Sequence, residues 1–125
     1  VLKKDTNGFF MMVEGSQIDW GGHNNDSPYI IREMIDFDNA IQKVLDFADQ
    51  DGETLVIITA DHETGGYAII GGDLDGTNLV GGFSTLKHSA AMIPVFAYGQ
   101  GAENFVGIYD NTQIFYKMME AFQFS

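Results

Sequence analysis

The longest regular pattern of apolar and polar positions lies in residues 29–50. Apolar side chains recur there every three or four residues, and most charged side chains lie on the other face; the apolar stripe consists of Met34, Phe37, Ile41, Val44, Leu45 and Ala48. This spacing predicts an amphipathic helix that packs one face on a core. Gly52 follows as a stop signal, because glycine readily adopts the left-handed conformation that ends helices.

Short apolar runs lie on both sides of this helix. Residues 9–13 read FFMMV and residues 55–59 read LVIIT, and runs of this length predict buried strands. A strand, a helix and a strand in succession predict a parallel pair with a right-handed crossover. Residues 93–99 predict another strand, with Pro94 near its start, where a missing N–H is tolerated.

A glycine-rich stretch follows the second of these strands. Residues 67–70 and 79–80 are apolar and flank residues 71–78, an arrangement that predicts a hairpin or loop excursion. The sequence DLDG within it resembles a calcium loop only faintly, because it lacks the further ligands at the required offsets. We interpret it as a turn.

The rest of the chain predicts one loop and one more helix. Residues 21–22 and 24–28 have the glycine, asparagine and proline content of a loop. Asn111 or Thr112 can cap a final helix over residues 113–122.

Composition bounds the class of protein. With 125 residues, of which 45% are hydrophobic, the chain is one small domain or a piece of a larger one. No apolar stretch is long enough for a membrane span. The chain has no cysteine, which excludes thiolate zinc sites and is compatible with a periplasmic or secreted protein. Because it begins at Val1 without a signal-peptide pattern, we interpret its start as a cut end.

The charge balance is strongly acidic. The chain has 18 acidic and 6 basic residues, for a net charge of −12. This argues against a nucleic-acid-binding surface, which needs basic residues. An anionic substrate would be repelled unless divalent cations dominated the local charge of its site. The alternative is that the acidity only keeps the protein soluble.

Asp61 and His62 are the most informative pair. They follow the predicted strand at residues 55–59, and α/β proteins build their sites where strands end. Adjacent strand residues point to opposite faces, so both side chains reach one site only where the strand breaks, and they could serve two neighbouring ions there. The alternative is a structural histidine paired with its neighbouring carboxylate.

Four further residues lie in contexts suited to metal ligands. Asp19 and His23 are four residues apart, so a helical turn would place them on one face, where they can bind one ion. An ordinary contact between the two explains that spacing equally well. Glu14 ends the first predicted strand, and His88 precedes the last one. Each is weak evidence alone, but all six residues are expected at strand ends or in adjacent loops.

These stretches resemble the alkaline phosphatase family. Residues 13–23 (VEGSQIDWGGH) are similar to its second metal-binding stretch, and residues 59–66 (TADHETGG) to its strand-end motif. His88 with the strand at residues 93–99 resembles its last metal histidine, and residues 36–40 resemble the start of its intervening helix. The resemblance covers nearly the whole chain in the right order. It implies a three-layer α/β/α sandwich, an α/β fold of which this chain is a C-terminal part.

The resemblance also implies a ligand set and cofactors. Asp19, His23 and His88 would bind a first zinc ion, and Asp61 and His62 a second. Glu14 would bind a magnesium ion. The complete enzyme would thus use two zinc ions and one magnesium ion, and in this chain zinc is expected at the first set. Trp20 and Glu63 would be neighbours of ligands.

The family's serine nucleophile belongs to a short Asp-Ser-Ala motif, and no such motif occurs in residues 1–125. We therefore expect residues 1–125 to be a single C-terminal fragment of the catalytic domain, inactive alone. The implied partners of the complete enzyme are phosphate monoesters and inorganic phosphate, and it would be a periplasmic or secreted homodimer. The fragment would expose apolar faces and self-associate.

Two other functions stay open from the sequence. The parent protein could be another hydrolase of the same superfamily, such as a phosphodiesterase or sulfatase, which keeps similar ligands but changes the nucleophile. The chain could also be a zinc-binding module without catalysis.

Overall fold

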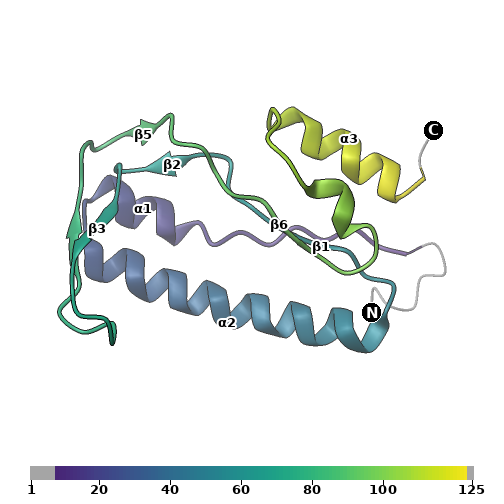
Figure 1. Ribbon diagram of the computed structural model, residues 1–125, viewed down its shortest axis with the longest axis horizontal. Helices are drawn as coiled ribbons and strands as arrows, with labels where there is room; N and C mark the ends of the chain where they lie inside the picture. Colours follow the sequence, from purple (N-terminus) through teal and green to yellow (C-terminus); the bar gives the residue numbers. More distant parts are fainter. Residues whose placement is uncertain (1–7, 124–125) are drawn as a thin grey trace.

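The computed structural model describes residues 8–123 and is dominated by one long helix, α2 (Ser27–Asp51) (Figure 1). The Asp26 side chain accepts a hydrogen bond from the Tyr29 backbone N–H at 2.9 Å and so caps the first turn. Gly52 ends the helix with φ of 75°, and its N–H donates to the Ala48 carbonyl. The predicted helix and its stop signal are therefore confirmed, with the helix slightly longer at both ends.

A short helix, α1 (Gln17–His23), packs on the start of α2. It contains buried Gly21 and Gly22, so the prediction of a loop at residues 21–22 is wrong. Glycine disfavours helix by about 1 kcal/mol relative to alanine, but here its small size permits close packing. A Cβ on Gly21 would lie 2.9 Å from the side chain of Ile30, which is itself buried.

Within residues 8–123, the strands form three antiparallel pairs. β1 (Val56–Ile58) pairs with β6 (Phe96–Tyr98), and β3 (Ala68–Gly71) pairs with β4 (Val80–Gly82), which confirms the predicted hairpin. β2 (Glu63–Thr64) pairs with β5 (His88–Ser89). The β3–β4 and β2–β5 pairs bring together the residues before and after the glycine-rich stretch at residues 71–78.

The predicted parallel pair is wrong for the described residues. Residues 9–13 are not in a strand, and the side chains from Phe10 to Val13 are exposed. The apolar run therefore lacks both the hydrogen-bonded neighbour and the cover that a buried parallel strand requires. The partner of β1 in this chain is β6, in antiparallel register.

The elements nevertheless follow a layered order. Figure 1 shows the β1–β6 pair between α2 and the final helix α3 (Thr112–Ala121), with the 3₁₀ helix η2 (Ala102–Phe105) leading from β6 toward α3. Contacts join α2 to β1, and η2 to both β6 and α3. The final helix was predicted within one residue of its observed bounds, with Asn111 at its N-cap.

The core of this layered unit is small. Among residues 8–123 the buried apolar side chains are those of Ile30, Ala48, Val56 and Phe105. Large apolar side chains remain exposed on the strands and around α3, including Phe96 and Ile108. Within the same residues, no helix has the combination of length and apolar character that a membrane crossing requires.

The close approach of α1 to β2 gives a first testable prediction. A Cβ on Gly22 would lie 2.8 Å from the Thr64 carbonyl oxygen, so Gly22→Ala must push the two elements apart. We expect the free energy of unfolding to fall by about 1–3 kcal/mol, measured by urea denaturation. The matched control is Gly71→Ala, whose Cβ would meet Val80 at 3.7 Å, an ordinary contact. Equal stability of the two variants would contradict this packing argument.

Candidate metal centre

The first two candidate ligands lie on α1. Asp19 and His23 are one helical turn apart, and the Asp19 Oδ1 atom is 3.5 Å from the His23 Nε2 atom. This confirms the prediction that the two side chains share one face of a helix. The helix is held in place by Gly21 and Gly22, which are buried against Ile30 and Thr64.

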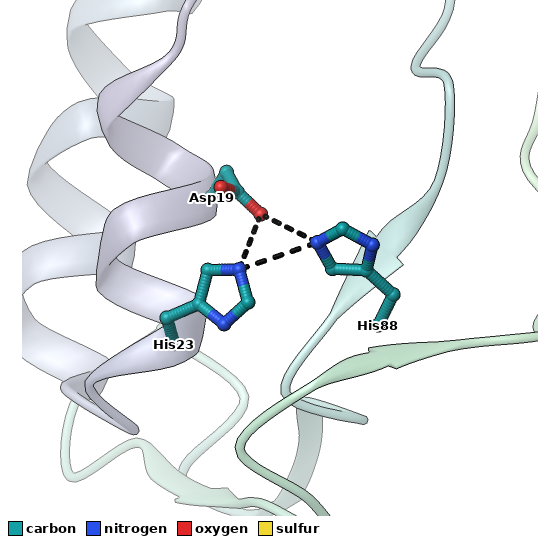
Figure 2. A group of neighbouring side chains, drawn as sticks. All are labelled: Asp19, His23 and His88. Atoms are coloured by element: carbon teal, nitrogen blue, oxygen red, sulfur yellow. Dashed lines mark hydrogen bonds and ion pairs between the residues drawn. The ribbon is translucent and has the colours of Figure 1, made fainter.

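His88 reaches the same point from the β2–β5 ribbon. Thr64 of β2 lies directly opposite His88 of β5, and Glu63 lies opposite Ser89. Because side chains alternate along a strand, Thr64 and His88 share one face of the ribbon. The His88 Nε2 atom lies 3.7 Å from Asp19 Oδ1 and 3.2 Å from His23 Nε2. Figure 2 shows the three side chains converging from α1 and β5.

The spacing of these three atoms suits one metal ion. Asp19, His23 and His88 form a group whose ligand atoms all lie within 4.8 Å of one another. Nitrogen and oxygen ligands about 2.0–2.1 Å from a tetrahedral zinc ion lie about 3.3–3.4 Å apart. The observed separations of 3.2, 3.5 and 3.7 Å are close to those of one triangular face of such a site. Imidazole and carboxylate are also donors that zinc accepts.

The backbone sets the proton position on His23. The Nδ1 atom of its ring lies 2.9 Å from the Leu86 carbonyl oxygen, which can only accept a hydrogen bond. Nδ1 therefore carries the proton, and in the neutral ring Nε2 presents a lone pair to Asp19 and His88. The Nε2 lone pair of His23 and the Asp19 carboxylate face the point that His88 Nε2 also reaches, and together they attract a cation there. A carbonyl behind a ligating histidine is the usual way in which proteins orient such a ring.

Asp61 and His62 lie beside this group. Their strand, β1, ends at Ile58, and they precede β2. The His62 ring stacks on the His88 ring with centroids 3.5 Å apart, and the His62 Nε2 atom is 3.4 Å from Asp61 Oδ2. The structure thus places His62 in contact with the first group, and Asp61 contacts His62 while its own side chain remains mostly exposed.

Glu14 does not join this group. It lines a cavity between the segment before α1 and the first half of α2, together with Glu33, Asp36 and Phe37. Trp20, which follows Asp19 on α1, is 57% exposed. Among the six predicted site residues, the structure therefore brings five together and places Glu14 in a separate, acidic cavity.

Two residues of the strand-end motif have roles that the sequence analysis did not assign. The Thr64 hydroxyl donates a hydrogen bond to Asp19 Oδ1 at 2.5 Å and lies 3.2 Å from His62 Nδ1. The Glu63 carboxylate accepts hydrogen bonds from the backbone N–H groups of Gly66 and Tyr67 and from the Ser89 hydroxyl. Their only signal in the sequence was their position directly after His62.

Glu63 fastens the ribbon on the face away from the ligands. Burial by itself raises the pKa of Glu63, but the hydrogen bonds from Ser89, Tyr67 and Gly66, with a smaller effect of nearby His62, leave that pKa below its ordinary value. The ionised carboxylate is therefore the form that holds β2 to β5. Since β5 carries His88, this contact helps to set the position of a candidate ligand.

Known proteins match this chain in sequence. The family model described as alkaline phosphatase matches residues 1–81. The chain belongs to the alkaline phosphatase family. It is 31% identical to alkaline phosphatase 3 of Bacillus subtilis, over 99% of this chain and 42% of that protein. It is 34% identical to the alkaline phosphatase of Escherichia coli K12, over 97% of this chain and 29% of that protein.

Solved alkaline phosphatases also share the fold. The enzyme from the Antarctic bacterium TAB5 matches with a TM-score of 0.90 and 50% identity, over 99% of this chain and 38% of that chain. The cold-active enzyme of a Shewanella species matches with a TM-score of 0.87 and 28% identity, over 98% of this chain and 47% of that chain. The α/β fold of the alkaline phosphatase type is thus confirmed. The chain spans less than half the length of each of these relatives.

The contacts of Glu63 predict an acid-dependent loss of stability. Because the pKa of Glu63 in the folded chain lies below its ordinary value of 4.5, ionised Glu63 stabilises the fold above that pH, and the contribution disappears as the pH falls through the folded-state pKa. Glu63→Gln removes this contribution. We expect urea unfolding to show a stability gap between wild type and variant that is widest above pH 4.5 and narrows below it.

The control for this measurement is Glu120→Gln, the same change on the exposed surface of α3. It should leave the pH dependence of unfolding as it is in the wild type. If the stability of Glu63→Gln falls with decreasing pH as much as that of the wild type, the Glu63 carboxylate does not stabilise the ribbon.

Proposed function

We propose that this chain carries the metal-binding part of a phosphomonoesterase, and that Asp19, His23 and His88 hold a zinc ion in it. The observation that carries the proposal is the convergence of one carboxylate and two imidazoles at the spacing of a single ion, in a chain of the alkaline phosphatase family. Three protein ligands leave the fourth position of a tetrahedral zinc site open, as in catalytic sites.

The remaining predicted ligands complete this proposal. Asp61 and His62 contribute to a second zinc site, because His62 stacks directly on His88. Glu14 contributes a carboxylate oxygen, a donor that magnesium prefers, to a magnesium site whose other protein ligands come from outside these residues. A variant of the TAB5 alkaline phosphatase has magnesium bound in its M3 site, which supports a magnesium ion in this family.

The chain's own residues bear on the reaction in definite ways. When bound, a pair of metal ions stabilises the charge on the entering and leaving oxygens of an in-line phosphoryl transfer. Leu86 keeps the lone pair of His23 Nε2 directed at the centre of the triad. Asp19 offsets the charge of a divalent ion only in part, which leaves a positive centre in a chain of net charge −12 and so a place where a phosphate ester can bind.

The nucleophile of the reaction is not proposed among these 125 residues. Ser89 donates to Glu63, and the Ser27 hydroxyl is bonded to the Tyr67 hydroxyl, so neither is directed at the triad. We infer that residues 1–125 form one part of a larger catalytic domain whose other part supplies the serine. The substrate is a phosphate monoester and the product inorganic phosphate.

We infer from the resemblance to the alkaline phosphatase family that the complete enzyme is a periplasmic or secreted homodimer. The isolated chain is expected to self-associate, because large apolar side chains such as Phe96 and Ile108 are exposed while the buried core is small. Nucleic-acid binding is disfavoured by the acidic charge balance.

Zinc titration tests the proposed site. We expect isothermal calorimetry of the metal-free chain to show uptake of zinc that is strongly weakened by His88→Ala and by His23→Ala, because each removes one of three ligands. The control is Asp75→Asn in the acidic turn, where Asp75 accepts hydrogen bonds from Thr77. Zinc uptake that is weakened by Asp75→Asn and not by the histidine variants would contradict a zinc site at Asp19, His23 and His88.

A phosphatase assay tests the missing nucleophile. A polypeptide of these 125 residues, supplied with zinc and magnesium, should release phosphate from a chromogenic phosphate monoester no faster than the buffer blank. The same assay on the polypeptide joined to the nucleophile-bearing part of an alkaline phosphatase relative should show turnover. Turnover by the 125 residues alone would contradict the proposed division of the site. Tight zinc binding without turnover in the joined protein would favour a zinc-binding module.

A further inference from the structure

The Thr64 hydroxyl lies between the two groups of candidate ligands. It donates its proton to Asp19 Oδ1 at 2.5 Å, and its oxygen lies 3.2 Å from His62 Nδ1. A hydroxyl has one proton to donate and can also accept. Because that proton is given to Asp19, Thr64 can only accept from His62. The His62 ring therefore carries its proton on Nδ1 and leaves Nε2 as the free ligand atom.

We propose that Thr64 is a positioning residue that links the two sets of metal ligands through one hydrogen-bonded chain, from His62 through Thr64 to Asp19. The proposal rests on the proposed function in taking Asp19 and His62 as ligands of neighbouring ions. Thr64 itself does not bind an ion. It sets the orientation of a carboxylate in one site and the proton position of an imidazole in the other.

The geometry of the ribbon explains why one side chain reaches both groups. Thr64 lies opposite His88 in the β2–β5 pair, so it stands on the ligand face. The Thr64 backbone also meets Gly22 of α1, where a Cβ would come within 2.8 Å. Because Gly22 lies one helical turn from Asp19, this contact keeps the Thr64 hydroxyl within hydrogen-bond reach of Asp19 Oδ1. Asp19 Oδ1 keeps its second lone pair for an ion, since a carboxylate oxygen can accept twice.

Removal of the hydroxyl has a definite consequence for His62. Without an acceptor at Nδ1, the ring proton is expected to move to Nε2, where Asp61 Oδ2 at 3.4 Å can accept it. Nε2 is then no longer available to an ion. The Asp19 carboxylate also loses the hydrogen bond from Thr64 on that oxygen. Partners of this kind behind metal ligands typically change metal affinity by 10–100-fold.

The first experiment reads the proton position directly in the metal-free chain. Long-range ¹H–¹⁵N NMR correlations, recorded about two pH units above the ordinary histidine pKa of about 6.5, distinguish a ring with the proton on Nδ1 from one with it on Nε2. We expect His62 in the wild type to carry it on Nδ1, and in Thr64→Val on Nε2. A wild-type His62 with its proton on Nε2 would overturn the proposal. This reading needs no variant, so it stands even where Thr64→Val does not fold.

The second experiment measures zinc affinity by competition with a chromogenic chelator. Thr64→Val keeps the shape without the hydroxyl and should weaken zinc binding about tenfold or more, whereas Thr64→Ser should bind as the wild type does. The matched control is Thr54→Val, because the Thr54 hydroxyl also donates to a carboxylate, that of Asp51, at 2.7 Å, in a part-buried position away from the triad.

The outcomes separate this proposal from the proposed function. Equal zinc affinity in Thr64→Val and wild type would overturn the link, as would Thr64→Ser behaving like Thr64→Val. A wild-type chain that takes up no zinc would contradict the zinc site, and the NMR reading of His62 would then decide the role of Thr64.

Discussion

The close approach of α1 to the β2–β5 ribbon is the constraint on which the candidate site depends. At Gly22 the helix lies so near Thr64 that a single added carbon would meet the Thr64 carbonyl at 2.8 Å. That distance places Asp19, one turn earlier, within reach of the Thr64 hydroxyl. It also places His23, one residue later, against His88. His23 and His88, which are 65 residues apart in the chain, thus contribute to one triad because α1 carries no side chain at Gly22, where it meets the ribbon.

The two faces of the β2–β5 ribbon, against which α1 packs, make different contacts. On one face Thr64 and His88 lie side by side and meet the ligands of α1. On the other, Glu63 and Ser89 fasten the strands and the turn at Gly66 through hydrogen bonds to an ionised carboxylate. Such charge-assisted hydrogen bonds are stronger than neutral ones. The β2–β5 ribbon has only two residues per strand and therefore few hydrogen bonds between its strands, so the hydrogen bonds to the Glu63 carboxylate supply much of what holds it together.

The acidic charge of the chain and the geometry of the triad both favour a bound divalent cation. The Asp19 carboxylate and the Nε2 atoms of two imidazoles converge within 3.2–3.7 Å, and the Leu86 carbonyl keeps the His23 proton on Nδ1, away from this point. Groups held in this way repel each other unless a cation or a proton lies among them. A bound divalent ion would relieve this repulsion and would create the positive centre that an acidic chain otherwise lacks for a phosphate ester.

Local sequence determined much of this protein. The stripe in residues 29–50 with Gly52 after it predicted α2, the spacing of Asp19 and His23 predicted one helical face, and the motif at Asp61-His62 indicated the family. These features depend on neighbours within a few residues. The sequence failed at Gly21 and Gly22, interpreted as a loop, and at residues 9–13, interpreted as a buried parallel strand. Only the tertiary structure decided the contact of Gly22 with Thr64 and the pairing of Thr64 with His88, and hence how the triad that the family resemblance implied is brought together. Each depends on the packing distance between elements distant in the chain, which no local pattern of residues encodes.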